Sequence, residues 1–167
     1  MADLIYAQNQ PGIGELPYGL RSTAQVGCGW VAAYNTLVLL GYHPSHRKLR
    51  RYFLWHGAVL FGLMGTILPA PGLYLQRLGQ EVKFSAWRGG FDSAILKADA
   101  AIVWYRWRKG AKFGAHFITV RWNGQEFIAY NLYSNSRGPE ALGSSFSDFL
   151  RKKNVRCPVV ATVLRKK

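Results

Sequence analysis

The sequence predicts an α+β domain in which helices occupy the first half of the chain and an antiparallel sheet the second. Three observations predict this class. Residues 28–40 are almost entirely apolar, β-branched and aromatic residues concentrate from residue 100 onward, and Asn123-Gly124 separates two segments typical of strands. With 167 residues and no linker-like stretch, we expect a single domain over residues 1–167.

The expected helices follow from their ends. Residues 28–40 are apolar on nearly all sides and stop before Gly41, which suits the position after a helix, so this helix should be central and buried. Four shorter helices are indicated by capping residues and a proline: residues 45–55 after Ser45, 71–78 opened by Pro71, a short helix capped by Asp92, and residues 145–153.

The expected strands are residues 80–84, 101–107, 116–122, 125–133 and 159–164. Asn123-Gly124 is a strong hairpin signal, because both central positions of a type I′ turn need a positive φ. A two-residue turn there would place His116 directly opposite Asn131 on one face of the hairpin. The same register would pair Arg121 with Glu126 on the other face.

The charge is strongly unbalanced. Twenty-two Lys and Arg against eight Asp and Glu give a net charge of +14, which favours acidic partners, although net charge alone bears mainly on solubility. Two cysteines and scattered histidines are too few for a disulfide framework or a structural zinc site, so we expect no metal and no cofactor.

Two segments bear on location. The N-terminus has an acid at Asp3 and no apolar run, so it is not a secretory signal, and a cytoplasmic location is expected. Residues 53–76 carry no formal charge and follow a basic cluster, as a membrane span would. Their glycines and prolines argue against a spanning helix, and we expect a buried core segment instead.

Cys28 is the leading candidate for chemistry. It lies between Gly27 and Gly29 at the start of the central helix, where free backbone N–H groups and the helix dipole stabilise an anion. A thiol at such a position is expected to be acidic, and the two glycines would let a substrate backbone approach closely. The alternative is a small buried cysteine at a tight turn.

A cysteine at a helix start, a histidine at the start of a strand and an asparagine that orients the histidine form a constellation used in acyl transfer. With Gly-Cys-Gly-Trp at residues 27–30, His-Phe-Ile-Thr-Val at 116–120 and Tyr-Asn at 130–131, the chain resembles papain-like cysteine peptidases, particularly the bacterial bacteriocin-processing type that cleaves double-glycine leaders. The resemblance rests on these short segments.

The resemblance implies helices packed on an antiparallel sheet, with Cys28 as nucleophile, His116 as general base and acid, and Asn131 as the group that orients His116. These peptidases usually carry an oxyanion glutamine six residues before the nucleophile, where this chain has Ser22. The nearest glutamine is Gln25, so Gln25, followed by Ser22, is the expected oxyanion donor. Residues expected to contact substrate are Gly27, Gly29, Trp30 and Trp107.

The predicted function is therefore that of a cysteine peptidase or related amidase that cleaves a peptide or protein substrate, with acidic flanks, through a thioester. Transfer to an amine instead of water would give an acyltransferase or transglutaminase-like activity from the same residues. The segment 104–112 interleaves aromatic and basic residues, so a further alternative is a catalytically silent or basic module that binds nucleic acid or an acidic partner.

Overall fold

The computed structural model of the protein describes residues 3–166, apart from the side chains of Lys109 and Lys112. The helices are α1 (Thr23–Val26), α2 (Cys28–Leu39), α3 (His46–His56), α4 (Ala70–Arg77), α5 (Phe91–Leu96) and α6 (Phe146–Lys152), with a 3-10 turn η1 (Arg88–Gly90). The strands are β1 (Pro17–Tyr18), β2 (Arg21–Ser22), β3 (Glu81–Ser85), β4 (Ala100–Lys109), β5 (Lys112–Trp122), β6 (Phe127–Tyr130), β7 (Glu140–Gly143) and β8 (Arg156–Leu164).

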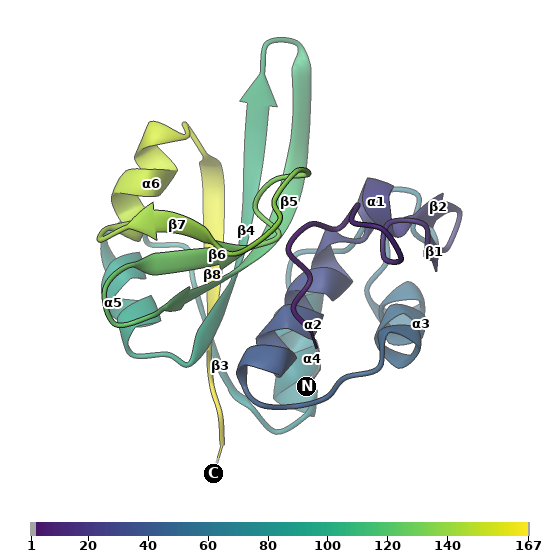
Figure 1. Cartoon of the computed structure of the whole chain (residues 1–167), viewed down its shortest axis with the longest axis horizontal. Coiled ribbons are helices and arrows are strands. Elements are labelled where there is room, and N and C mark those ends of the chain that lie inside the picture. Colours follow the sequence, from purple (N-terminus) through teal and green to yellow (C-terminus); the bar gives the residue numbers. More distant parts are fainter. Residues whose placement is uncertain (1–2, 167) are drawn as a thin grey trace.

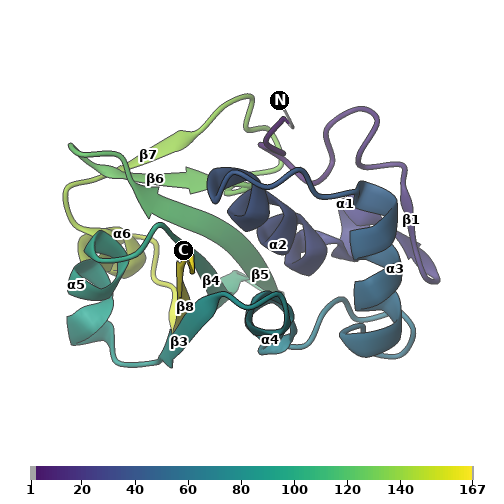
Figure 2. The same cartoon turned by 90° about the horizontal axis from the view of Figure 1, so that it is seen from below.

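Six strands form one antiparallel sheet in the order β3-β8-β4-β5-β6-β7, while β1 and β2 pair separately. The last strand, β8, lies inside the sheet between β3 and β4. Helices α2 and α4 lie on one side of the sheet and α5 and α6 on the other, whereas α3 stands farther out beyond α2 (Figures 1 and 2). The predicted α+β class and the packing of the central helix against the sheet are confirmed.

Helix α2 is enclosed almost completely because it is apolar on every side. Ten of its residues are buried, and its most extensive strand contact is with β5. Trp30 at its first turn is fully buried and packs edge-on to Tyr34. The Thr119 hydroxyl of β5 donates a hydrogen bond of 2.9 Å to the Ala32 carbonyl, which fixes the helix against the strand.

The opposite side of the sheet is covered by two short helices. Phe91 and Ile95 of α5 and Phe146 and Leu150 of α6 are fully or nearly fully buried in a second apolar cluster on the sheet. Asp92 does not cap α5 as predicted, because Gly90 occupies that position and Asp92 lies in the first turn. Its carboxylate instead reaches the start of the other helix, α6.

The predicted register of the β5–β6 hairpin is wrong by two residues. Trp122 pairs with Phe127, so the turn holds four residues, and the Asn123 side-chain oxygen accepts hydrogen bonds from the N–H groups of Gln125 and Glu126. Arg121 consequently lies opposite Ile128, and the expected pair between Arg121 and Glu126 does not form. An asparagine that caps its own turn competes with the shorter two-residue turn.

No helix within residues 3–166 is long and apolar enough to cross a membrane. The uncharged run 53–76 forms the end of α3, a looped segment and all of α4 except Arg77. The expectation that this run is core is wrong for its middle part, since Leu60, Phe61 and Met64 are exposed. Leu60 and Phe61 both have a positive φ, so the chain turns sharply there instead of continuing a helix.

Candidate active site

Cys28 begins α2 and its side chain is buried on the α2 face of the sheet, with 9% of the residue exposed. The N–H groups of Phe117, Cys28 and Gly29 stabilise negative charge on the sulfur, but burial outweighs them and raises the pKa of the thiol to about 11. The expectation of an acidic thiol is therefore wrong for this structure, because loss of water around the sulfur exceeds the benefit of the helix start. Cys28 is a neutral thiol at neutral pH.

The two glycines beside Cys28 face side chains of the protein itself. A Cβ on Gly27 would lie 2.6 Å from a side-chain carbon of Thr23, and a Cβ on Gly29 would lie 2.5 Å from the Thr66 side chain. The glycines therefore allow close packing of the protein's own segments, which corrects their predicted role in substrate contact. Trp30 is likewise enclosed in the core, where no substrate can reach it.

His116 lies on β5 immediately before Phe117. Its Nε2 atom is 2.6 Å from the backbone carbonyl oxygen of Asn131. A carbonyl can only accept, so Nε2 carries the proton and Nδ1 is the basic nitrogen of the neutral ring. Burial lowers the pKa of His116, and the hydrogen bond to Asn131 opposes this shift. The ring of Tyr105 meets the imidazole edge-on, with ring centroids 6.0 Å apart.

The pair that forms differs from the predicted one. The pairing of β5 with β6 ends at Thr119 and Tyr130, so Asn131 is not a strand partner of His116, and the contact to the imidazole comes from the Asn131 main chain. The asparagine side chain has other partners: its Oδ1 accepts from the Gln8 N–H at 2.7 Å, and its Nδ2 donates to the Phe117 carbonyl at 3.4 Å. Asn131 thus ties the N-terminal segment to β5.

Asn131 is also the point at which the chain leaves β6. Its φ of 61° is in the left-handed region, which asparagine tolerates better than most residues. The backbone N–H donates to the Tyr6 carbonyl at 3.0 Å, so the residue is held at both its main chain and its side chain. This local geometry directs the Asn131 carbonyl toward His116.

Gln8 is the functional candidate that the sequence did not reveal. Its side-chain Nε2 donates to the Ala24 carbonyl at 2.8 Å, one helical turn before Cys28, while its Oε1 is buried without a hydrogen-bond partner among the described residues. Gln8 lies twenty positions before Cys28 in the sequence. Only the long-range contacts to Asn131 and Ala24 identify it, and no local pattern could have done so.

The expected oxyanion residues, Gln25 and Ser22, are engaged elsewhere. Gln25 is exposed, and its side-chain oxygen accepts from the Ser22 N–H at 3.1 Å as part of the capping of α1. This contact engages the Gln25 side chain in local capping, and neither residue lines the cavity that contains His116. The sequence neighbourhood of Cys28 was a misleading guide, because the nearest glutamine has a local capping role.

A cavity of about 660 Å³ opens beside His116. Gln8 and Ala24 form one wall, and Tyr105 and Trp107 of β4 form another. The remaining wall consists of the segment 131–135, Phe149 of α6, Lys153 just after α6, and Val155. Trp107, predicted to contact substrate, is one of the lining residues and is partly exposed. The volume is typical of a site for a small molecule or for several residues of a peptide.

Cys28 itself is not one of the residues that line this cavity, although Ala24, four residues earlier, is. Among the described residues, its sulfur makes no hydrogen bond to the His116 ring, which is bonded instead to Asn131. The negative charge of a Cys28 thiolate would nevertheless act on Tyr18 and Tyr105, since each has a pKa raised mainly by burial and further by Cys28. The sulfur therefore lies beside the N–H of Phe117, the residue that follows His116 on β5, and the described residues show no direct contact between the thiol and the imidazole.

The described residues include no group of three or more metal-ligating side chains that could hold a metal ion. Comparison with protein-family models and with curated proteins gave no match to this chain.

Proposed function

We propose that the protein is a cysteine peptidase or related amidase in which Cys28 is the nucleophile and His116 the general base. The observation that carries this proposal is the hydrogen bond from His116 Nε2 to the Asn131 carbonyl, next to a strand residue, Phe117, whose N–H acts on the Cys28 sulfur. That bond leaves Nδ1 of His116 unprotonated and available as a base.

The reaction starts from a neutral pair, because burial raises the pKa of Cys28 and lowers that of His116. The Cys28 proton moves to Nδ1 of His116 as the sulfur attacks the carbonyl carbon of a peptide or amide. The imidazolium then protonates the departing amine, and the C–N bond breaks to leave a thioester on Cys28. Water, deprotonated by His116, attacks the thioester, releases the acid and restores the thiol.

The oxyanion of the tetrahedral intermediate needs hydrogen-bond donors. The N–H groups of Cys28 and Gly29 act on the sulfur and lie at the correct end of α2. Gln8 supplies the side-chain donor in this proposal, since only one proton of its Nε2 is used by Ala24 and the residue lines the cavity. Gln8 thus takes the role that the sequence assigned to Gln25.

The cavity favours a peptide with acidic residues beside the cleaved bond. Arg108 and Lys153 are the charged residues of its wall, and no carboxylate lines it among the described residues. Aromatic and apolar groups, including Tyr105, Trp107 and Phe149, provide the rest of the surface. A peptide that places apolar residues on this surface and a carboxylate near Arg108 would fit both features.

The test is hydrolysis of a mixed peptide library by the full chain, followed by mass spectrometry. Cys28→Ala is expected to abolish cleavage, and Cys157→Ala, which alters the other cysteine at an exposed position, should leave it unchanged. Gln8→Ala is expected to lower kcat about 10²- to 10³-fold, as loss of one oxyanion donor does elsewhere, while Gln25→Ala should have little effect. Cleavage that survives Cys28→Ala would overturn the proposal.

A second candidate function is supported by basic and aromatic residues of β8 and of the β4–β5 hairpin, which projects from the body of the molecule (Figure 1). Arg106 of β4 stands directly opposite Arg156 of β8, and like charges in such pairs are unfavourable unless an anion lies between them. Phe113, 77% exposed, is opposite Arg108 on the same hairpin. Arginines beside an exposed aromatic ring suit single-stranded nucleic acid.

This candidate predicts binding of a single-stranded oligonucleotide, with an affinity whose logarithm falls linearly with the logarithm of the salt concentration. Replacing Arg106 and Arg156 by Gln should weaken binding, whereas replacing Arg151 and Lys152 on α6 should change it less. Equal effects of the two pairs would indicate attraction by net charge alone and would eliminate the hairpin as a site.

A further inference from the structure

An exposed apolar surface lies on the helical side of the molecule, away from the sheet. We call it the apolar tip; it comprises Leu20, Trp55, Leu60, Phe61, Leu63 and Met64. Exposed fractions reach 72% for Leu20, 65% for Trp55 and 70% for Met64. Single exposed apolar residues are common, but a contiguous group of this kind marks an interaction surface.

The three segments that carry the apolar tip are in contact with one another. The Leu20 N–H, in the turn between β1 and β2, donates to the Phe61 carbonyl at 3.2 Å. The rings of Trp55 and Phe61 meet edge-on with centroids 5.2 Å apart. The tip is therefore one continuous surface built from the end of α3, the β1–β2 turn and the loop that follows α3.

The loop has a defined shape. Ala58 and Thr66 form an antiparallel bridge at its base, and the Tyr18 hydroxyl lies 2.9 Å from the Thr66 hydroxyl. Gly62 has a φ of 85° and lies so close to the Tyr18 carbonyl that a Cβ would approach it to 2.4 Å. The protein thus holds apolar side chains outward on a packed loop.

A row of cations leads to the apolar tip along α3. Arg47, Arg51 and Trp55 are spaced four residues apart and so share one side of the helix, with Lys48 beside them. Arg47, Lys48 and Arg51 are exposed, and none forms an ion pair among the described residues. Like charges four residues apart destabilise a helix slightly, so Arg47 and Arg51 lower the stability of α3 unless an anionic partner binds them.

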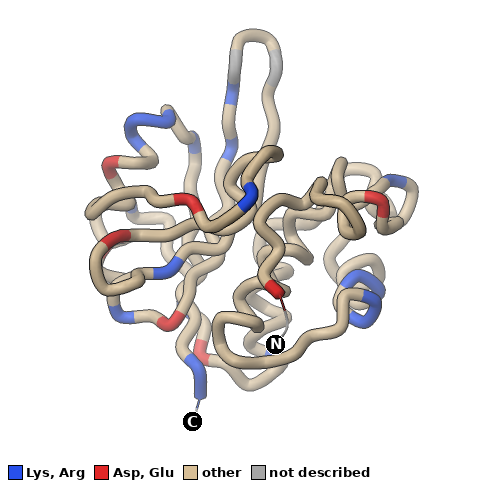
Figure 3. The backbone as a smooth tube through the Cα atoms, in the orientation of Figure 1, with Lys and Arg blue, Asp and Glu red and all other residues tan. Residues whose placement is uncertain are grey.

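The surroundings offer no compensating acid. The sequence has no Asp or Glu from residue 16 to residue 80, a range that contains all of α1 to α4. Figure 3 shows basic residues on α3 and no acidic residue on that helix. The nearest carboxylate in the preceding segment is Glu15, which accepts a hydrogen bond from the Gly12 N–H.

The order of these groups matches the layers of a lipid bilayer surface. At about 1.5 Å per residue, Arg51 and Arg47 lie about 6 and 12 Å from Trp55 along the axis of α3. Tryptophan favours the boundary between headgroups and acyl chains, aliphatic side chains favour the acyl region, and Lys and Arg favour anionic headgroups. Cations, then an aromatic ring, then an aliphatic loop follow this order.

We propose that the apolar tip and the Arg47, Lys48 and Arg51 row bind together to the surface of an anionic lipid bilayer, with the loop 60–64 inserted among the lipids. A second copy of the chain is a poorer occupant, because a symmetric contact through the tip would bring the two cation rows near each other. Binding of this kind does not involve Cys28 and would occur equally in a protein without enzymatic activity.

The experiment is sedimentation of the full chain with vesicles of phosphatidylcholine alone or of phosphatidylcholine and phosphatidylglycerol in equal amounts. The protein is expected to bind the anionic vesicles and to bind neutral vesicles much more weakly. The double variant Leu60→Ser/Met64→Ser should lose at least about tenfold in affinity, since each side chain would leave the acyl region. Arg47→Gln/Arg51→Gln should lose about 25-fold, near fivefold for each cation.

Matched control variants distinguish binding by the apolar tip and the cation row from binding through net charge or through exposed apolar residues in general. Arg151→Gln/Lys152→Gln removes the same charge from α6, and Trp87→Ser/Leu96→Ser removes two exposed apolar groups on the other side of the sheet. Both control variants should bind anionic vesicles within about twofold of the unmodified chain. All variants alter exposed side chains, so unchanged circular dichroism and melting temperature will show that they are folded.

Three results would overturn the proposal. Equal losses from the α3 and α6 charge variants would mean that net charge alone attracts the protein. Full binding by Leu60→Ser/Met64→Ser would mean that the loop does not insert. A dimer in light scattering that this apolar variant dissociates, without vesicle binding by the unmodified chain, would assign the tip to a contact between copies.

Discussion

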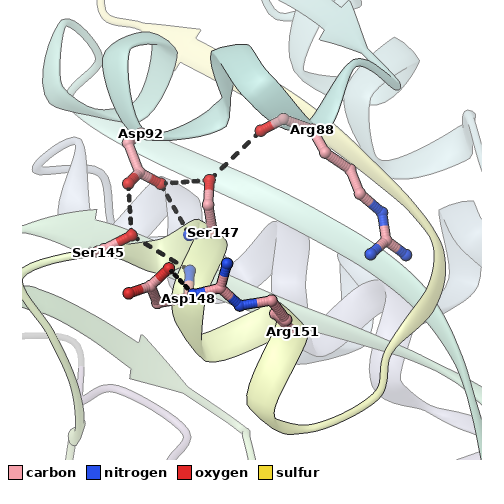
Figure 4. Close-up of polar contacts among 6 residues, drawn as sticks. All are labelled: Arg88, Asp92, Ser145, Ser147, Asp148 and Arg151. Carbon is pink, nitrogen blue, oxygen red and sulfur yellow. Dashed lines mark hydrogen bonds and ion pairs between the residues drawn. The ribbon is translucent and has the colours of Figure 1, made fainter.

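The two sides of the sheet are held by different kinds of contact. On one side, the twelve-residue helix α2 is buried along nearly its whole length and is held mainly by apolar packing. On the other, α5 and α6 have six and seven residues and are joined by a polar cluster around Asp92 (Figure 4). The apolar sequence of a long helix is enough to bury it against the sheet, whereas two short helices also need specific hydrogen bonds to each other.

The polar tie is made of hydrogen bonds between residues far apart in the chain. The Asp92 carboxylate accepts from the Ser145 hydroxyl at 2.8 Å and from the N–H and hydroxyl of Ser147 at 2.8 and 2.9 Å. Ser145 also accepts from the Asp148 N–H and so caps α6. One carboxylate therefore satisfies the start of a helix that lies more than fifty residues later.

The largest expected effect comes from the apolar side. Trp30→Ala removes a fully buried side chain that packs against Tyr34 and His46, and it should lower the free energy of unfolding by about 3–5 kcal/mol. Urea unfolding followed by circular dichroism measures the change. Trp30→Phe is the matched control: it keeps an aromatic ring and removes an indole N–H that has no partner among the described residues, so its cost should be much smaller.

The next effect tests the polar side. Asp92→Ala leaves the Ser147 N–H and two hydroxyls without their acceptor and should cost about 2–3 kcal/mol in the same measurement. Ser147→Ala keeps the main-chain hydrogen bond to Asp92 and should cost about 1 kcal/mol or less. If the two variants are equally mild, apolar packing holds both sides of the sheet and the contrast between them disappears.

This contrast also explains what could be predicted from the sequence. The bounds of α2, α3 and α6 were close to those expected, because each has a local signal: an apolar run before Gly41, and the capping residues Ser45 and Ser145. The predicted role of Asp92 was wrong. Aspartate before a short helix is typical of a cap on that helix, but the Asp92 carboxylate binds residues at the start of α6 instead. Local patterns cannot specify a partner that lies fifty residues away.

The candidate site shows the same division. Cys28 and His116 were identified from local patterns, a helix start and a strand start. Cys28 does begin α2, but β5 starts at Lys112, so His116 lies within the strand and not at its start. Gln8, the main-chain contact of Asn131 and the burial of Cys28 were missed, because each depends on the packing of distant segments. The turn after Trp122 has two more residues than predicted, which shifts the pairing of β5 with β6 by two residues. A shift of two leaves every side chain on the same face of the sheet, so the alternation of apolar and polar residues could not reveal it.

A third prediction concerns pH and the cysteine on the α2 side. The pKa of Cys28 is about 11 in the folded protein, above its usual value of about 8.5, so the unfolded chain loses this proton first. Stability from this group is fully present below pH 8.5 and falls as pH rises toward 11, by about 2–3 kcal/mol near pH 10.5. Urea unfolding from pH 8 to pH 10.5 should show this slope.

The variant Cys28→Ala isolates that effect. It should be less dependent on pH than the unmodified chain over the same range, while Cys157→Ala, which changes an exposed cysteine, should keep the full slope. Iodoacetamide should correspondingly modify Cys157 faster than Cys28 at pH 7, since only the thiolate reacts. Faster modification of Cys28 at neutral pH would show an activated thiol and contradict the dominance of burial.

The smallest expected effect concerns Asn131, which follows β6 and contacts both Gln8 and His116. Asn131→Gly keeps the left-handed backbone and the carbonyl that holds His116, but removes the side chain that accepts from the Gln8 N–H. It should cost about 1 kcal/mol in stability and leave the pKa of His116, followed by NMR of its imidazole, below the usual value and nearly unchanged. Asn131→Ala, strained at this φ, should cost about 1–2 kcal/mol more. A rise or fall of one pH unit or more in the His116 titration of Asn131→Gly would return the orienting role to the side chain, as the sequence had predicted.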